Sequence, residues 1–262
     1  MFENMKKITF LFIVFGIAIN TYSQQKTTVF KKGEWLSYKM SYSGFLKAGN
    51  ATLSLDTDTI KGKEVFHVTG KGWTSGIIKW FFNVDDTYQS FFDTKTIKPY
   101  VFKRNINEGG YIINREIKFN YESKKATVLD FKLQTSETVD INNVQDMMSA
   151  FYYLRNQDVS DLNIGDEIAL DMFMDSEIYP FKLVYLGEEL LKTRFGKVKS
   201  LKFRPMVQAG RVFKENESVT IWITADDNKI PIKLKASLAV GSLRAELDAY
   251  KGLANSFKIV YD

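Results

Sequence analysis

Two arginines stand at apolar positions of expected strands, and their side chains offer the most specific chemistry in the chain. Arg115 falls in the same alternation as Ile113 and Ile117, which puts its guanidinium on the covered face of a strand. Arg104 follows Phe102 in the same way. A buried guanidinium must be paired, because an unpaired charge in the interior costs several kcal/mol. The pattern therefore predicts either an internal ion pair or a cation that holds the acidic group of a ligand.

Residues can be assigned to both outcomes. For the internal ion pair, which is the more common arrangement, Asp86 or Glu108 could supply the carboxylate. For the ligand site, aromatic side chains would line a cavity around the two arginines. The candidate ligand-binding residues are Arg104, Arg115, Tyr88, Tyr152 and Trp222, with Phe92 as a further aromatic side chain of the lining.

Few residues are arranged for catalysis, metal binding or nucleotide binding. His67 is the only histidine, and general acid–base or metal chemistry would need further groups that converge on it. The absence of cysteine removes thiolate zinc sites, cysteine nucleophiles and disulfides. No G-x-S-x-G elbow, Walker loop or G-x-G-x-x-G motif occurs. We therefore expect no catalytic residue, no metal ion and no cofactor.

Acidic residues leave one enzymatic alternative open. Asp226-Asp227-Asn228 is typical of a turn, where short polar side chains bond the local backbone. Asp85 and Asp86 would point to opposite faces of a strand. A carbohydrate hydrolase would need two carboxyl groups that face each other about 5–10 Å apart across a cleft. Asp86, Glu108 and Glu116 are the candidates for such a pair.

The elements that must position these residues are mainly β-strands. Apolar and polar residues alternate in residues 36–42, 232–238 and 243–249, which is typical of antiparallel sheet with one covered face. Aromatic residues make up 15% of the chain and there are only 4 prolines, a composition that suits long strands. Polar turn signals separate the runs at Lys61-Gly62-Lys63, Glu108-Gly109-Gly110, Glu122 to Lys125 and Asp226 to Lys229.

One segment has helical rather than strand periodicity. Its apolar side chains form a helical stripe, which predicts the main helix at about 143–156. Asn143 is the expected N-cap, with Asp146 three positions on in the manner of a capping box. Arg155 near the other end suits the helix dipole. A shorter helical turn is predicted within residues 75–82, where apolar residues are too crowded to alternate.

The simplest architecture is mainly β: one curled antiparallel sheet, or a partly closed β-barrel or β-roll, with the main helix packed on or into it. Two sandwiched sheets are the competing arrangement. A barrel would remove the exposed strand edges that otherwise need protection. No linker rich in Pro, Gly or Ser divides the chain, and there is no internal repeat. We therefore expect residues 24–262 to form a single β-rich domain.

Residues 1–23 have the order of a secretory signal peptide. A basic start at Met5-Lys6-Lys7 precedes an apolar run from Ile8 to Ile19 and a small-x-small ending at Thr21-Tyr22-Ser23. The apolar run is shorter than the roughly 20 residues that span a bilayer. We therefore expect cleavage rather than a retained anchor, a periplasmic location, and no membrane span in the mature protein. Without cysteine there is no lipobox residue to acylate, so a lipoprotein is not expected.

Residues 221–234, with the sequence Ile-Trp-Ile-Thr-Ala-Asp-Asp-Asn-Lys-Ile-Pro-Ile-Lys-Leu, carry the most specific signature, followed by Val240-Gly241-Ser242. Further matching positions are Lys32-Gly33-Glu34, Tyr38, Tyr42, Ala48-Gly49, Asp86-Thr87-Tyr88, Ser90, Asp93, Gly109-Gly110-Tyr111, Gln145-Asp146, Phe151 to Arg155, Leu162, Gly165, Thr193 and Gly196. In this order they resemble an exported bacterial family, domain of unknown function 3108 (DUF3108), over nearly the whole mature chain. The resemblance implies a rolled, mostly antiparallel sheet with one main helix. It brings no established catalytic or binding residues.

The residues and the resemblance together leave three functional hypotheses. The first is a non-catalytic envelope protein that holds a lipid, another amphiphilic molecule or an envelope polymer inside the curled sheet, with Arg104 and Arg115 orienting an acidic group. The second is an interaction or assembly factor with a solid core, which predicts an exposed apolar patch or a long unpaired strand edge. The third is the carbohydrate hydrolase. Nucleic acid is not an expected partner, because the net charge of +5 comes from interspersed residues of both signs.

Overall fold

Most strands of the sheet pair with the strand that follows them in the chain, because short polar turns connect them. The computed structural model describes residues 29–206, 219–237 and 241–261, so the expected signal peptide lies outside the described residues. The helices are α1 (Ile78–Phe81) and α2 (Met147–Arg155). The strands are β1 (Trp35–Tyr42), β2 (Leu46–Ile60), β3 (Lys63–Thr74), β4 (Asp85–Asp93), β5 (Pro99–Glu108), β6 (Tyr111–Asn120), β7 (Lys125–Asp130), β8 (Thr135–Asp140), β9 (Val144–Gln145), β10 (Glu167–Met174), β11 (Glu177–Thr193), β12 (Gly196–Met206), β13 (Val219–Thr224), β14 (Pro231–Ser237) and β15 (Ser242–Lys251).

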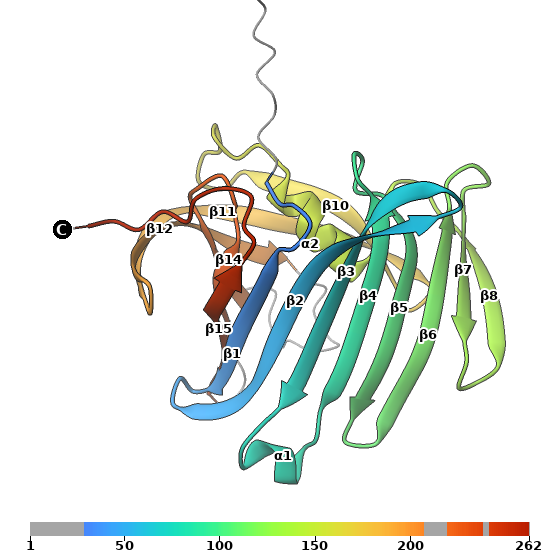
Figure 1. Ribbon diagram of the computed structural model, residues 1–262, viewed down its shortest axis with the longest axis horizontal. Coiled ribbons are helices and arrows are strands. Elements are labelled where there is room, and N and C mark those ends of the chain that lie inside the picture. Colours follow the sequence, from blue (N-terminus) through green and yellow to red (C-terminus); the bar gives the residue numbers. More distant parts are fainter. Residues whose placement is uncertain (1–28, 207–218, 238–240, 262) are drawn as a thin grey trace, which may run out of the picture.

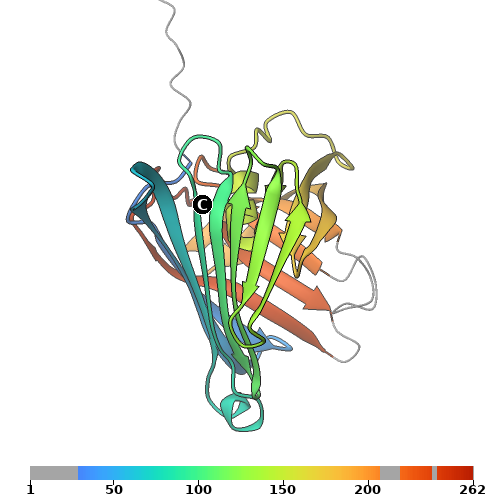
Figure 2. The ribbon, with the colours of Figure 1, turned by 90° about the vertical axis from the view of Figure 1, so that its right-hand side faces the viewer.

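All these strands belong to one curled sheet that does not close. Its order is β8-β7-β6-β5-β4-β3-β2-β1-β15-β14-β13-β12-β11-β10-β9. The first and last strands are therefore neighbours, with Trp35 opposite Lys251. The free edges are β8 and β9, which come from the middle of the chain. Figures 1 and 2 show the two halves of the sheet curving around α2. The expected curled antiparallel sheet is confirmed, and it takes the place of the competing sandwich of two sheets.

The main helix begins later than the sequence pattern predicts. We expected it over about 143–156 with Asn143 as the N-cap, but α2 begins at Met147 and its N-cap is Asp146. The Asp146 carboxylate accepts hydrogen bonds from two backbone N–H groups of the first turn, and Ser149 completes the capping box. The two residues before this cap form β9, which pairs in parallel with β10. Val144 and Gln145, which the sequence pattern assigned to the helix, therefore form a strand.

Helix α2 fills the inside of the curl with side chains. It lies between β4 and β10, which it contacts, and Figure 1 shows it enclosed by the curved sheet. Its Met147 and Met148 pack against the core of β5, β6, β7 and β10. Phe151 packs against the core around Leu36 on β1, and Leu154 packs against that of β11 and β12. The middle of the curl is therefore a packed core.

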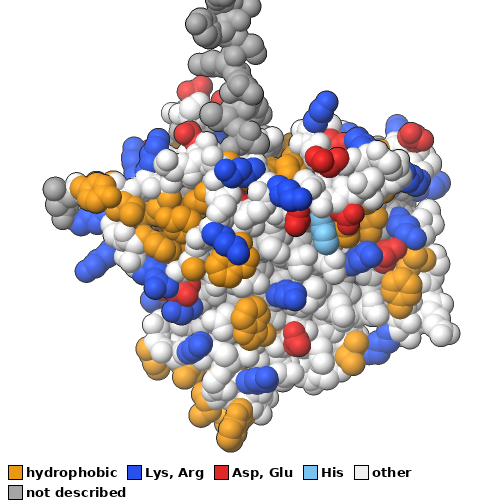
Figure 3. All heavy atoms as spheres, viewed as in Figure 1, with side chains coloured by type: hydrophobic (Ala, Val, Ile, Leu, Met, Phe, Trp, Pro, Cys, Tyr) orange, Lys and Arg blue, Asp and Glu red, His pale blue; other side chains and the backbone are white. Residues whose placement is uncertain are grey.

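One end of the sheet carries exposed apolar side chains. The connection between β3 and β4 contains α1, and none of the residues of this helix is buried. Trp80 is 89% exposed and Phe81 is 82% exposed. In Figure 3 hydrophobic side chains gather at the lower end of the view, where Figure 1 places α1. The short helical turn predicted within residues 75–82 is confirmed.

Candidate functional site

Arg104 and Arg115 face each other across β5 and β6. Two like charges in opposite positions repel, so the pair needs a carboxylate between them. Asp175, in the turn between β10 and β11, supplies it: its Oδ1 accepts from Nη1 of Arg104 at 2.5 Å and from Nη1 of Arg115 at 3.0 Å. Asp130 on β7 accepts from Nε of Arg115 at 2.7 Å. The turn from one half of the sheet thus closes over two arginines of the other half.

The two arginines are therefore paired within the chain, by Asp130 and Asp175 and not by the expected Asp86 or Glu108. A hollow of about 360 Å³ adjoins Arg115, but its other charged lining residues are all acidic. An acidic ligand group would have to displace Asp175 and approach these carboxylates. The acidic residues of the lining are Asp130, Glu137, Asp175 and Glu177. A role of the two arginines in ligand binding stays a prediction.

Of the aromatic candidates, only Tyr88 lies beside this ion-pair cluster. Tyr88 lies on β4, opposite Arg104 of β5, and its ring stacks on Phe102 with the ring centroids 6.5 Å apart. Burial, and next the charge of Asp86, raise the pKa of Tyr88 to about 12. Its hydroxyl therefore stays protonated at neutral pH and can act as a hydrogen-bond donor.

Tyr152 and Trp222 lie in two other clusters, so the five predicted residues do not form one site. Tyr152 is 1% exposed and packs edge-on against Phe30, with ring centroids 4.8 Å apart. Phe92 packs on the same tyrosine. Trp222 is buried on β13 and donates its indole N–H to Glu189 at 2.9 Å. Both aromatic residues serve the packing of the core.

The carboxyl groups considered for hydrolysis are not spaced as that chemistry requires. Asp86 and Glu108 share a hydrogen bond, and burial together with the charge of Asp86 raises the pKa of Glu108. Carboxyl groups in hydrogen-bond contact are closer than the roughly 5 Å of a retaining glycosidase. Glu116 lies on the other face of the sheet, in ion pairs with Lys103 and Lys118. These residues give the hydrolase hypothesis no geometric support.

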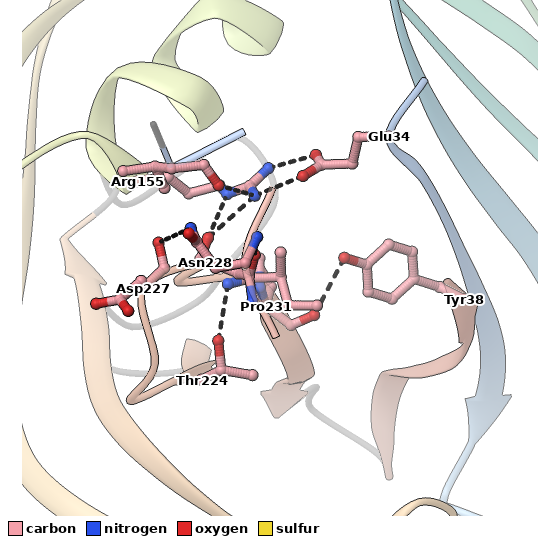
Figure 4. A network of polar contacts seen from close by, with 10 residues as sticks. Glu34, Tyr38, Arg155, Thr224, Asp227, Asn228 and Pro231 are labelled. Carbon is pink, nitrogen blue, oxygen red and sulfur yellow. Dashed lines mark hydrogen bonds and ion pairs between the residues drawn. The ribbon is translucent and has the colours of Figure 1, made fainter. Parts of the chain in front are cut away.

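A buried ion pair that sequence reasoning missed joins α2 to the chain before β1. Arg155 and Glu34 are 3% and 1% exposed, and they form a bidentate pair with distances of 2.6 and 2.8 Å. The guanidinium also donates to the carbonyl oxygen of Asn228, at 3.1 Å from Nε and 3.0 Å from Nη2. Figure 4 shows this arrangement. Three aromatic rings surround the guanidinium, those of Phe30, Phe151 and Tyr152.

This network connects parts of the chain that are far apart in sequence. Glu34 precedes β1, Arg155 ends α2, and Asn228 lies in the turn between β13 and β14. Burial opposes the charge of Arg155, but the hydrogen bonds to Glu34 outweigh it and raise the pKa of the arginine. Arg155 was expected only to complement the helix dipole. The sequence signal that could have revealed the pair is the position of Arg155 on an otherwise apolar helical stripe, because a charge that becomes buried there needs a partner.

Asp146 is a second buried charge at the other end of α2. Its Oδ1 accepts from the backbone N–H groups of Met148 and Ser149 at 2.8 Å, and its Oδ2 accepts from Ser90 Oγ at 2.6 Å. Burial is the largest influence on this carboxyl group and outweighs these hydrogen bonds, so its pKa rises to about 6. The cap thus fixes α2 to β4 through a group that titrates near neutrality.

The raised pKa of Asp146 predicts a pH dependence of stability. The folded protein holds this proton at pH values where the unfolded chain, with a pKa of 3.8, has lost it. The contribution of Asp146 to the free energy of unfolding is therefore largest below pH 3.8 and falls as the pH rises through about 6. The difference between a pKa of about 6 and one of 3.8 corresponds to about 3 kcal/mol.

Urea unfolding of the parent and of Asp146→Asn from pH 4 to 7 measures this contribution. The stability difference, parent minus variant, should fall as the pH rises. Asp93→Asn is the control without a slope, because hydrogen bonds from Lys63 and two backbone N–H groups outweigh burial and lower the pKa of Asp93. Its contribution is lost only as the pH falls below about 3.8, so the parent-minus-variant difference for Asp93→Asn should be nearly constant from pH 4 to 7. A difference for Asp146→Asn that is constant across this range would contradict the assignment.

A cleft of about 510 Å³ lies beside α2, between β10 and β11 and the turn from β4 to β5. The side-chain oxygen of Gln145 is buried in this region and has no hydrogen-bond partner among the described residues. Lys98 lies over the ring of Tyr121 at 5.1 Å and makes no ion pair with another described residue. The apolar part of the lining is Tyr153, Ala169, Leu170, Pro180 and Phe181, and the polar part is Thr96, Lys98, Asn143, Gln145, Asp171 and Lys182.

Two further residues considered in the sequence, His67 and Asp226, make structural contacts in the described parts of the chain. His67 lies 3.0 Å from the side-chain oxygen of Gln89 and stacks on Phe91, as an ordinary strand histidine does. The predicted turn at Asp226 is confirmed, since its carboxylate accepts from Thr224 and from the backbone of Asn228. No group of three or more potential metal ligands occurs within residues 29–206, 219–237 and 241–261. None of the helices in these ranges is long and apolar enough to span a bilayer.

Comparison with known proteins supports the fold. A β-barrel-like protein of DUF1849 from Brucella abortus has a TM-score of 0.52 at 10% sequence identity, covering 84% of this chain and 98% of that one. A candidate lipoprotein from Parabacteroides distasonis has a TM-score of 0.32 at 10% identity, covering 86% and 99% of the two chains. A candidate exported protein with a YmcC-like fold from Bacteroides fragilis has a TM-score of 0.30 at 10% identity, covering 84% and 96%.

The last two likenesses are too distant to carry an argument, and the first shows the fold alone. Among curated proteins, none matches the chain. Residues 37–248, from β1 to β15, match the family described as Protein of unknown function (DUF3108). The matched range includes α2 and every strand that builds the cleft. The chain therefore belongs to the DUF3108 family.

Proposed function

We propose that this protein is a non-catalytic, exported protein of the cell envelope that binds an amphiphilic ligand in the cleft beside α2. The apolar part of the ligand lies against Tyr153, Leu170 and Phe181, and its acidic group lies at Lys98. The observation that carries this proposal is a cleft of about 510 Å³ with a mixed lining and an unpartnered Gln145 oxygen. Ligand sites are typically clefts of roughly 300–1,000 Å³ with apolar walls and a few polar groups.

The cleft lining holds two lysines, Lys98 and Lys182, and one carboxylate, Asp171, so its charges support an acidic ligand better than those around Arg104 and Arg115. Lys98 makes no ion pair with another described residue, whereas each of the two arginines is bonded to a carboxylate of the chain. Lys182, a second cation of the lining, is paired with Glu167 at 2.7 Å, but both side chains are about half exposed. Such surface pairs are weak and open easily. The expected signal peptide, residues 1–23, supports a periplasmic location.

Binding of parinaric acid, a fluorescent fatty acid, tests the proposal. We expect Tyr153→Ala to weaken binding about 10-fold through lost apolar contact. Lys98→Glu should weaken it by a similar factor, because it reverses the charge at the acidic group. Lys95→Glu is the matched control: Lys95 is exposed on the same turn but does not line the cleft. Equal affinity of the parent and both cleft variants, or no binding at all, would refute the site.

A ligand carried by the protein itself gives an independent test. Native mass spectrometry of the protein purified after export should show an added mass that organic solvent extracts. Tyr153→Ala should lose most of this added mass and Lys95→Glu should keep it. If the added masses form a glycan series, the bound ligand is an envelope polymer and not a lipid. A protein that is always empty would argue against the proposal.

The second hypothesis, an interaction factor, needs an exposed apolar patch or an open strand edge. The edge strand β8 has the sequence Thr-Ser-Glu-Thr-Val-Asp, and all of its residues except Val139 are exposed. A short, polar and acidic edge of this kind discourages pairing with another chain. The exposed apolar side chains around α1 are therefore the feature that this hypothesis leaves open.

A further inference from the structure

The connection that carries α1 projects a group of apolar side chains away from the sheet. We call residues 75–84 the α1 tip. Its side chains are mostly solvent-exposed, and none of the residues in the short helix is buried. Figure 3 shows the hydrophobic group at the lower end of the molecule, beyond the ends of the strands in Figure 1. The exposed fractions are 57% for Ile77, 89% for Trp80, 82% for Phe81 and 50% for Phe82.

Two neighbouring hairpins add apolar side chains at the same end of the sheet. Phe45, in the turn between β1 and β2, is 84% exposed. The N–H of Ser75 in the tip donates to the carbonyl oxygen of Ala48 at 3.1 Å, which holds this hairpin beside the tip. Tyr111, after the turn between β5 and β6, is also exposed. The apolar group therefore extends over three adjacent connections.

The backbone of the α1 tip is held in place by hydrogen bonds, although most of its side chains are exposed. The N–H of Phe82 donates to the oxygen of Ile78 at 2.8 Å, closing the helical turn. The N–H of Gly109 donates to the oxygen of Asn83 at 2.8 Å and ties the tip to the next hairpin. Backbone groups bonded within the protein can enter an apolar medium at lower cost than free ones. The tip is thus a preformed projection.

The tip and the connection between β1 and β2 carry lysines, which suit an anionic surface. Residues 43–48 and 73–84 contain Lys47 and Lys79 and no Asp or Glu, while Asp85 directly follows the tip and Glu108 ends β5. Tryptophan and lysine are side chains that favour the membrane–water interface, with the lysine near acidic head groups. A protein partner would need a broad complementary face with a polar rim, whereas the helix of the tip is a single turn of 4 residues at the end of the sheet. A fluid bilayer can surround such a projection.

We propose that the α1 tip docks this protein on an anionic phospholipid bilayer. Trp80 and Phe81 enter the interfacial region, while Lys47 and Lys79 contact the head groups. The strands stay outside the bilayer with their ends toward it. This docking does not depend on the cleft beside α2, so the ligand proposal can fail while the docking holds.

Sedimentation with vesicles of equal parts phosphatidylethanolamine and phosphatidylglycerol tests the proposal. The purified protein should bind these vesicles, and Trp80→Ala with Phe81→Ala should lower the partition coefficient by at least about 30-fold. Lys79→Glu should lower it about 5-fold, an effect that high salt reduces. The emission of Trp80 is obtained as the spectrum of the parent minus that of Trp80→Phe. On vesicle binding this emission should shift to shorter wavelength, and brominated lipid should quench it.

The control carries Ile164→Ala and Tyr261→Ala, which remove two equally exposed apolar side chains from other parts of the surface. It should bind vesicles as the parent does. Circular dichroism verifies that each variant is folded. Absence of vesicle binding by the parent, or equal losses in the control and the tip variant, would overturn the proposal. A parent that dimerises through the tip without lipid, in sedimentation velocity, would overturn it in favour of a second copy of the chain.

Discussion

The Arg155→Met variant is expected to lose about 3–5 kcal/mol of unfolding free energy. The substitution removes the guanidinium from a pair in which Glu34 is 1% exposed, so a buried carboxylate would lose both of its charged hydrogen bonds. It would also leave the carbonyl oxygen of Asn228 without two of its donors. Urea denaturation should show a lower midpoint, and the slope should stay unchanged if the folded state keeps its extent.

Two comparisons make this prediction specific. Lys125→Met breaks the pair of Lys125 with Asp140, whose side chains are 52% and 88% exposed, and should cost less than about 1 kcal/mol. The double variant Arg155→Met with Glu34→Leu replaces both charges by apolar groups and should recover much of the loss. A loss for Arg155→Met no larger than that for Lys125→Met would show that the buried pair does not stabilise the fold.

The second large effect is expected at Tyr152, where Tyr152→Ala should cost about 3–5 kcal/mol. Its ring is buried against three other rings at centroid distances of 4.8 to 5.4 Å, and truncation would leave a cavity among them. The adjacent Tyr153 is partly exposed and lines the cleft. Tyr153→Ala should therefore cost much less stability and should weaken ligand binding instead.

Thermal and urea unfolding of the two neighbouring variants would separate packing from binding on one helix. Similar losses of stability in both would contradict the assignment of Tyr152 to the core and Tyr153 to the cleft. Tyr152→Phe is a milder companion, because it keeps the ring contacts. It should retain most of the stability that Tyr152→Ala loses.

Strand patterns in the sequence were enough to predict the sheet and its covered face. The alternation that placed Arg115 with Ile113 and Ile117 on one face agrees with the burial in β6. The start of α2 was wrong because local periodicity does not show that Val144 and Gln145 pair with β10. That pairing is a contact between segments separated in sequence, and it outweighs the local preference of these two residues for a helix.

The ion pairs show the same limit more sharply. The burial of Arg104 and the partial burial of Arg115 followed from alternation, and burial demanded partners. The partner Asp175 comes from a turn more than 50 positions further along the chain, and no local rule selects it. Arg155 and Glu34 are separated by 121 positions. For Arg104 and Arg115 the sequence thus predicts that each charge needs a partner, while the curl of the sheet decides which partner it meets. For Arg155 the sequence predicted neither the need for a partner nor its identity.

The cleft beside α2 was not predicted at all. Its lining comes from the β4–β5 turn, the segment before α2, the helix itself, and β10 and β11. None of these segments has an unusual composition, so the site arises only from their arrangement. The apolar crowding at residues 77–82, in contrast, was visible in the sequence. Its exposure was not, because crowded apolar residues are more often buried.

Because β1 pairs with β15, the sheet stays incomplete until the last strand has been synthesised. Hairpins on either side can form as the chain emerges, N-terminus first. Trp35 of β1, however, can pair with Lys251 only after β15 is present. Joining such distant segments is slow because the intervening chain loses entropy. The bare flank of β1 is meanwhile open to aggregation. We therefore expect the pairing of β1 with β15 to be a slow step in the folding of this protein.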